Sequence, residues 1–212
     1  HGGMWGWVSA DEVEVVPPAS NERGALKTGL HWHREILEHR RHLKRRVRRD
    51  WVVVRSVQAM RALGVNNIGA VCNFEDVMPA DDGDGARRAA KRYEAIYNRF
   101  FVGGLFKGAY PEEVMEGLEP HMPKGWQDDF DLIREPIDWF GINYYTCKRI
   151  RADSGPWPSV KEVEGPLPKT QMDWEIKPDG LENILKWLQA NYTGALPVYI
   201  TENGMAIRSP TM

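Results

Sequence analysis

The sequence has few cysteines, no long apolar run and little net charge. No stretch approaches the roughly 18 apolar residues needed to span a bilayer, so we expect no membrane anchor. Cys72 and Cys147 are the two cysteines among 212 residues, which excludes a disulfide scaffold and is typical of a protein from a reducing compartment. With no basic and apolar leader visible, we expect a cytoplasmic protein.

The sequence also lacks the motifs that hold phosphates or metal ions. Neither a G-x-G-x-x-G nor a Walker pattern occurs, which argues against a nucleotide site after an early strand. The six histidines show no ligand spacing with carboxylates, and the two cysteines show no C-x-x-C spacing. We therefore expect no metal and no cofactor, and each cysteine is interpreted as a packed thiol.

One segment is strongly basic although the whole chain carries a net charge of −2. Residues 31–49 hold eight of the 28 Lys and Arg residues and four of the six His residues. Such a block is found in nucleic-acid binders, on solvated helix faces, or in a locally aberrant segment. It lacks the interleaved aromatic residues of a single-strand binder, and the rest of the chain has no matching features. We therefore expect no nucleic-acid partner.

Beyond residue 57 the chain alternates between helical and strand-like patterns. We expect strands at about 65–74, 137–145 and 197–203, and helices ending near Leu63, beginning near Ala86 and Pro111, and covering 181–192. This alternation is typical of a parallel sheet, as found in doubly wound folds and in (β/α)₈ barrels. The barrel is favoured because polar residues follow the strands where a phosphate turn would otherwise be expected. The fold class predicted is α/β, an incomplete (β/α)₈ TIM barrel with about strands five to seven, in residues 57–212. Residues 1–56 are expected to form an irregular or disrupted segment.

Side-chain alternation brings four polar residues to one end of these strands. Gly141, Asn143 and Tyr145 should point together, as should Val198, Ile200 and Glu202, with Asn73 at the end of the earlier strand. A carboxylate in an apolar strand needs hydrogen-bond partners to stay ionised. Asn and Tyr side chains could supply them and so aim Glu202 as a nucleophile at an anomeric carbon. The alternative is that Glu202 caps the next turn or pairs with a surface Arg.

The motifs ITENG, at the end of an apolar strand, and DWFGINYYT, earlier in the chain, resemble glycoside hydrolase family 1, the β-glucosidase and β-galactosidase family. The segments MDWEIKPDGL, IGAVCNF and YEAIYNRFFVGGLFKGAYPEEV continue the resemblance, which covers about residues 57–206.

The resemblance implies a role for each residue of the predicted site. Glu202 would be the nucleophile of a retaining mechanism, and Tyr145 would hydrogen-bond to it. Asn143 and Asn73 would line the sugar site. Trp174 would flank the entrance, where its ring could stack on the leaving group; the alternative is an ordinary aromatic buried in a loop. The implied substrate is a β-linked oligosaccharide or an aryl or alkyl β-glycoside.

The sequence departs from the family at the acid/base residue. The family carries the Glu of an Asn-Glu-Pro there, and this chain has Asn21-Glu22-Arg23 with no strand-like run before it. Glu22 is the candidate acid/base, although the Pro is replaced by Arg.

The family also continues after TENG with a further helix and an eighth strand, and its first four strands have little counterpart here. We therefore expect a fragment of a β-glycosidase with impaired or no activity alone, whose Arg/His-rich segment arises from a disrupted reading frame. The alternative is a catalytically inactive carbohydrate-binding or scaffold remnant.

Overall fold

The computed structural model describes residues 51–207. Glu22 and the basic segment at 31–49 lie outside the described residues. The chain divides into two compact units. One is made of the residues up to Asn66 together with Pro120–Glu135, and the other of Asn67–Glu119 together with the residues from Pro136 onward. Each unit is described by itself.

The smaller unit is helical where it is described. It contains α3 (Trp51–Ala62), η5 (Trp126–Asp129) and α7 (Phe130–Ile133). Gly64 has a φ of +81°, and the amide of Val65 donates to the carbonyl of Met60, which closes the end of α3. This is the helix end that the sequence predicted at Gly64. The side-chain amide of Gln58 donates to Glu135 at 3.1 Å within the same unit.

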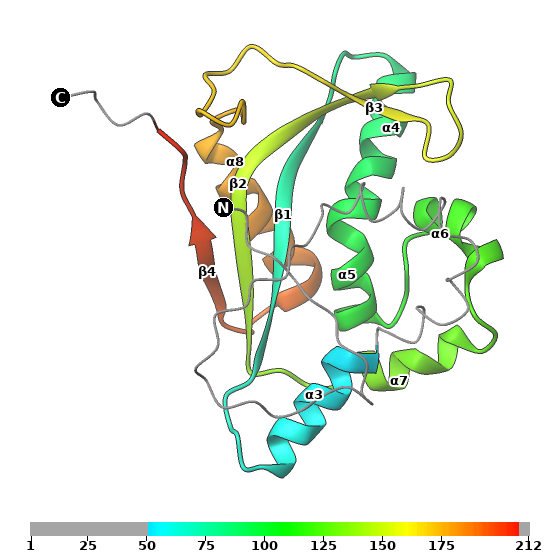
Figure 1. The fold of residues 1–212 in the computed structure, drawn as a ribbon, viewed down its shortest axis with the longest axis vertical. Coiled ribbons are helices and arrows are strands. Elements are labelled where there is room, and N and C mark those ends of the chain that lie inside the picture. Colours follow the sequence, from blue (N-terminus) through cyan, green and yellow to red (C-terminus); the bar gives the residue numbers. More distant parts are fainter. Residues whose placement is uncertain (1–50, 208–212) are drawn as a thin grey trace. The chain divides into compact units, whose positions relative to one another are not determined.

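The larger unit is built on a four-stranded sheet (Figure 1). Strands β1 (Gly69–Pro79), β2 (Trp139–Ala152) and β4 (Val198–Asn203) are parallel, with β2 between the other two. The short strand β3 (Val160–Val163) runs antiparallel to the end of β2. Parallel strands joined through helices are the repeating unit of a TIM barrel, so the unit is an incomplete (β/α)₈ barrel.

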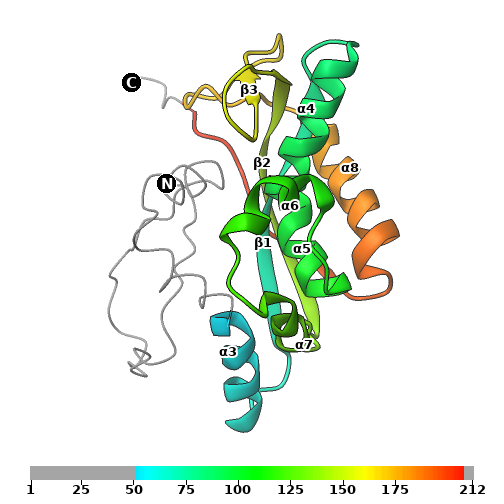
Figure 2. The same ribbon diagram turned by 90° about the vertical axis from the view of Figure 1, so that its right-hand side faces the viewer.

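Helical segments connect these strands. A continuous run of α4 (Asp84–Glu94), η2 (Ala95–Arg99), α5 (Phe100–Val102) and η3 (Gly103–Lys107) is followed by α6 (Glu112–Leu118) and η4 (Glu119–His121). The second connection is α8 (Pro178–Leu188) with η6 (Gln189–Thr193). Figure 2 shows α4 and α8 on the same side of β1 and β2.

The core lies between the strands and these helices. Phe74, Phe140, Ile142 and Tyr144 project from the strands and are almost fully buried against Val102 and two further helix residues, Ile184 and Leu188. Phe140 makes edge-to-face contacts with Phe74 and Phe106, at centroid distances of 6.1 and 5.3 Å. Because strand side chains alternate, the residues between these core positions face the other side of the sheet.

Two strand predictions were too short. β1 continues to Pro79, beyond the predicted end near residue 74, and β2 continues to Ala152, beyond the predicted end near residue 145. The ladder crosses a register shift between Phe74 and Asp76, where the side chain of Asn98 hydrogen-bonds to both the amide and the carbonyl of Glu75. The bonds from η2 therefore satisfy the backbone where the ladder is interrupted, and pairing resumes beyond it.

In a regular helix the sequence spacing of Tyr93, Phe100 and Phe101 would place them on one apolar face, and the structure departs from that face at Phe101. Tyr93 is buried, whereas Phe101 is 42% exposed and Val102 is fully buried in its place. The reason is the π-helical turn of η2, which adds a residue per turn and so rotates the buried face by about one position.

Candidate active site

Three site residues lie in one row across the parallel strands. Asn73 on β1 is the register partner of Asn143 on β2, and Asn143 is the register partner of Glu202 on β4. The row stands on the face of the sheet opposite the aromatic core. The strand register thus brings together the three side chains that the sequence predicted to converge.

The two asparagines are joined by a hydrogen bond, and the Thr201 hydroxyl lies beside it, within reach of both Asn143 and the carbonyl of Ile142 at 3.0 Å. The Thr201 hydroxyl donates to Oδ1 of Asn143 at 2.6 Å, and Nδ2 of Asn143 donates to Oδ1 of Asn73 at 2.8 Å. Asn143 is 2% exposed, so its amide is held by these contacts rather than by solvent. Nδ2 of Asn73 takes no part in this hydrogen bond, so it is the group that can donate to a bound molecule.

Sequence reasoning missed Thr201 and assigned it to the opposite face from Glu202. Val198 packs on the aromatic core, so strict alternation would place Glu202 on that same face. The register shifts at the step from Ile142–Ile200 to Asn143–Glu202, which leaves Thr201 as an extra residue in β4. Because of this bulge, both Thr201 and Glu202 reach the face that carries Asn143. A bulge has no sequence signal in an apolar strand, so periodicity alone could not reveal it.

Gly141 leaves room for the side chains on either side of it. A Cβ atom at this position would lie 2.7 Å from Cγ2 of Val71 and 2.9 Å from Cγ2 of Thr201. Any side chain would therefore clash with Val71 on β1 and with Thr201 on β4, so a substitution would displace Thr201 beside the row.

Tyr145 is the hydrogen-bond partner of the Glu202 carboxylate. Its hydroxyl donates to Oε2 of Glu202, and both side chains are half-buried. Partial burial, together with the bond to Glu202, raises the pKa of Tyr145 to about 12. The phenol therefore stays protonated at neutral pH and remains a donor to the carboxylate. Among the described residues a tyrosine, and not the arginine of the alternative interpretation, holds Glu202.

Trp174 lies beside this pair. Its ring is tilted by 57° to that of Tyr145, with the centroids 5.7 Å apart, and it is partly exposed. The partial exposure leaves some of the indole surface free for contact with a ligand. All five residues named from the sequence within 51–207, namely Asn73, Asn143, Tyr145, Trp174 and Glu202, belong to one cluster.

Within residues 51–207 the His, Cys, Asp and Glu side chains form no group of three or more that could hold a metal ion. No helix of that part is long and apolar enough to cross a membrane.

Comparison with known proteins gives a consistent family. The model of glycosyl hydrolase family 1 matches residues 28–211, a longer stretch than the resemblance read from the sequence motifs. Beta-glucosidase A of Thermotoga maritima is 33% identical over 203 residues, which are 94% of this chain and 44% of that protein. The 1,4-beta-D-glucan glucohydrolase of Thermotoga neapolitana is 38% identical over 66% of this chain and 33% of that protein.

A solved structure agrees in fold. The family 1 glycoside hydrolase of Thermotoga maritima, complexed with a cyclophellitol analogue described as a transition state mimic, has a TM-score of 0.70 and 35% identity, over 76% of this chain and 36% of that one. The chain thus spans between 33% and 44% of the length of these relatives. With a family match over most of its residues and a barrel segment that superimposes on a solved member, this chain belongs to glycosyl hydrolase family 1.

Proposed function

We propose that the chain carries the nucleophile side of a retaining β-glycosidase site. The observation that carries the proposal is the Glu202 carboxylate at the end of β4, hydrogen-bonded by Tyr145 and flanked by Asn73 and Asn143. A carboxylate that is oriented, half-exposed and hydrogen-bonded to a neutral donor is suited to attack on an anomeric carbon.

In the proposed first step, an oxygen of Glu202 forms a bond to the anomeric carbon of a β-glycoside. The bond from that carbon to the leaving-group oxygen breaks, and this oxygen takes a proton from a general acid. In the second step, water gives its proton to the same group and displaces Glu202 from the sugar, so the β configuration is retained. The general acid and base is proposed to be Glu22.

The remaining residues of the cluster bind the substrate in this proposal. The side-chain amide nitrogen of Asn73, whose amide oxygen accepts from Asn143, donates to a sugar hydroxyl. Trp174 offers its indole to the leaving group, which favours aryl β-glycosides over small alkyl ones. The names of the relatives support the same class of substrate, a β-linked oligosaccharide or an aryl or alkyl β-glycoside.

The test is covalent labelling with 2,4-dinitrophenyl 2-deoxy-2-fluoro-β-D-glucopyranoside. Dinitrophenolate leaves without a proton, so the reaction reports the nucleophile independently of the acid/base residue. We expect the chain to gain one fluoroglucosyl group, located by peptide mass spectrometry on Glu202. The Glu202→Gln variant should gain none, whereas Glu182→Gln, at an exposed site on α8, should label as the parent does. Label on another residue, or no label on the parent, would overturn the proposal.

A second candidate function is carbohydrate binding without turnover. The observation that favours it is that the described cluster holds a single carboxylate, whereas retaining hydrolysis needs two carboxyl groups about 5–5.5 Å apart. A chain that is labelled on Glu202 but releases no phenol from an unactivated aryl β-glucoside would support this function.

A further inference from the structure

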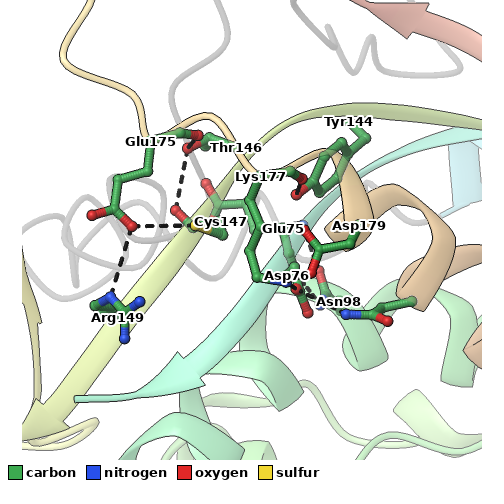
Figure 3. Close-up of polar contacts among 11 residues, drawn as sticks. Glu75, Asp76, Asn98, Tyr144, Thr146, Cys147, Arg149, Glu175, Lys177 and Asp179 are labelled. Carbon is green, nitrogen blue, oxygen red and sulfur yellow. Dashed lines mark hydrogen bonds and ion pairs between the residues drawn. The ribbon is translucent and has the colours of Figure 1, made fainter. Parts of the chain in front are cut away.

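The segment that carries Trp174 is fastened to the sheet on both sides of that residue. We call residues 164–177, between β3 and α8, the Trp174 loop. The loop is attached to β1 and β2 by the side chain of Glu175 and by the side chain and carbonyl of Lys177 (Figure 3).

Glu175 makes the first attachment, entirely to β2. Its carboxylate oxygen Oε2 accepts from the thiol of Cys147 at 3.4 Å and lies 3.8 Å from Nε of Arg149. Its carbonyl accepts from the hydroxyl of Thr146 at 3.0 Å. The residue is 7% exposed, so the carboxylate faces these groups and little water.

Lys177 makes the second attachment and reaches both strands. Its ammonium lies 2.7 Å from Asp76 on β1 and 2.9 Å from Asp179, and its carbonyl accepts from the Tyr144 hydroxyl at 2.8 Å. Figure 3 shows this cluster and the Glu175 cluster side by side above the strands. Trp174, next to Glu175 in the chain, is therefore restrained from the β2 side and from the α8 side.

The loop also folds over the Glu175 attachment. A Cβ atom at Gly165 would lie 2.1 Å from Oε1 of Glu175 and 2.3 Å from Nε of Arg149, so the chain crosses closely over the ion pair and a side chain here would displace it. The amide of Thr170 donates to the carbonyl of Trp174 at 2.9 Å, and that of Ile176 to Pro168 at 2.8 Å. The loop is thus braced internally as well.

The ion pair of Glu175 and Arg149 has a geometry that contributes little to the stability of the fold. Within the described residues, Oε1 of Glu175 and Nε of Arg149 are buried and have no hydrogen-bond partner. A buried pair with unsatisfied atoms recovers little of its desolvation cost, so it is weak evidence for a stabilising role. What the pair does fix is the place of the backbone that bears Trp174.

We propose that Glu175 is a positioning residue for Trp174. Its pairing with Arg149 and Cys147 holds the indole beside Tyr145 before any ligand arrives, so that little ordering entropy is lost when an aromatic leaving group stacks there. The ligand part of this statement rests on the proposed function; the positioning part does not. The consequence is selective: binding of an aryl β-glycoside depends on Glu175, and binding of a methyl β-glycoside does not.

The test uses 5-fluorotryptophan in the whole chain and ¹⁹F NMR. The chain has nine tryptophans, so its spectrum contains few signals, and the Trp174 signal is identified by its loss in Trp174→Phe. In Glu175→Gln we expect this signal to shift and broaden, and the amides of Thr170 and Ile176 to exchange at least tenfold faster. On titration, the Kd for phenyl 1-thio-β-D-glucopyranoside should rise at least fivefold, while that for the methyl thioglycoside stays unchanged.

The matched control is Glu164→Gln, in the same loop, whose exposed carboxylate pairs with Lys169 at 3.1 Å and should change nothing. Arg149→Met removes the other partner and should reproduce the effect of Glu175→Gln, which also covers the case in which one variant does not fold.

An unchanged Trp174 signal and unchanged exchange in both variants would overturn the positioning role. An equal loss of affinity for the phenyl and methyl ligands would also overturn it, since that is the mark of general disruption. A parent signal that ignores the phenyl ligand but changes in Glu175→Gln would support the positioning role and would count against the leaving-group contact in the proposed function.

Discussion

At the scale of single residues, the hydrogen bond from Tyr145 to Glu202 joins a neutral donor to a carboxylate acceptor. The pKa of Tyr145 is raised to about 12, so the phenol keeps its proton at neutral pH. The bond therefore persists across the neutral range and keeps one carboxylate oxygen occupied. In the proposed mechanism the other oxygen of Glu202 is the one that attacks.

The first prediction concerns Tyr145→Phe. Hydrogen bonds to charged groups contribute about 1.5–3 kcal/mol, so we expect labelling of Glu202 by the fluorosugar to slow by roughly 10- to 100-fold. The rate is measured by intact-mass spectrometry over time. Tyr199→Phe is the control, because Tyr199 lies on β4, the strand of Glu202, with 56% of its surface exposed. Equal rates for the two variants would show that the Tyr145 hydroxyl does not orient the carboxylate.

The second prediction concerns the proposed acid/base residue. In Glu22→Ala, release of phenol from phenyl β-D-glucopyranoside should fall at least 100-fold, because this poor leaving group needs a proton. Release of dinitrophenolate from the dinitrophenyl glucoside should be accelerated by added azide, with a β-glucosyl azide as product. If Glu22→Ala matches the parent on the phenyl glucoside, another group supplies the proton.

The described members of the candidate site were largely named from the sequence. Asn73, Asn143, Tyr145, Trp174 and Glu202 were named from motifs and strand ends, and the structure gathers them in one cluster. Thr201 and Glu175 were missed because their contacts depend on a bulge and on a loop path. Neither leaves a periodic pattern in the sequence.

At the scale of elements, the joint between β1 and the helix run 84–107 contains a buried carboxylate. Glu75 accepts a hydrogen bond from the Tyr93 hydroxyl at 2.7 Å, and Lys148 and Glu162 are the charged groups nearby. Burial raises the pKa of Glu75 to about 7 from 4.5, with Lys148 and the Tyr93 bond acting in the opposite direction. The folded chain therefore binds a proton here more tightly than the unfolded chain does.

The third prediction is a pH dependence caused by Glu75. Its stabilising contribution should be fully present below about pH 4.5 and should be lost as the pH rises through about 7. The parent should therefore lose on the order of 3 kcal/mol over this range relative to Glu75→Gln. Urea unfolding of both proteins at pH 5 and pH 8 measures the difference. A constant difference between the two proteins at both pH values would contradict the prediction, and Glu182→Gln serves as the control.

Elements were predicted better in kind than in extent. The three parallel strands, the helix beginning near residue 86 and the last helix were expected, because their apolar periodicity is set by burial. The antiparallel β3 was not, since its four residues lie in a connection rich in Pro and Gly. Its pairing comes from the unforeseen length of β2, so tertiary context decided it.

At the scale of the whole molecule, the sheet is unevenly supported. β2 has a neighbour along both of its edges and lies against the buried core, whereas β4 is six residues long, pairs with β2, and has exposed Tyr199 and Ile200. Local stability follows burial and pairing, so it should fall from β2 toward β4.

The fourth prediction follows from that gradient. By hydrogen-exchange mass spectrometry, amides of β4 should exchange at least tenfold faster than those of β2 between Phe140 and Tyr144. Labelling of Glu202 by the fluorosugar should slow exchange in β4 more than in β2, because the sugar links the strand to its neighbours. Equal protection of the two strands in the free chain would contradict the gradient.

The bulge at Thr201 has a consequence for how this strand tolerates change. A pleated strand has two phases, and each inserted or deleted residue exchanges them. The extra residue sets the phase after Ile200 opposite to the phase before it, so Val198 faces the hydrophobic core and Glu202 faces the polar row. Deletion of Thr201 would remove the bulge and leave Glu202 opposite Asn143 on the polar face. A regular ladder in which Thr201 itself paired with Asn143 would instead turn the carboxylate toward the core. The face that carries the carboxylate is therefore decided by the backbone register at Thr201 as much as by the identity of the residues.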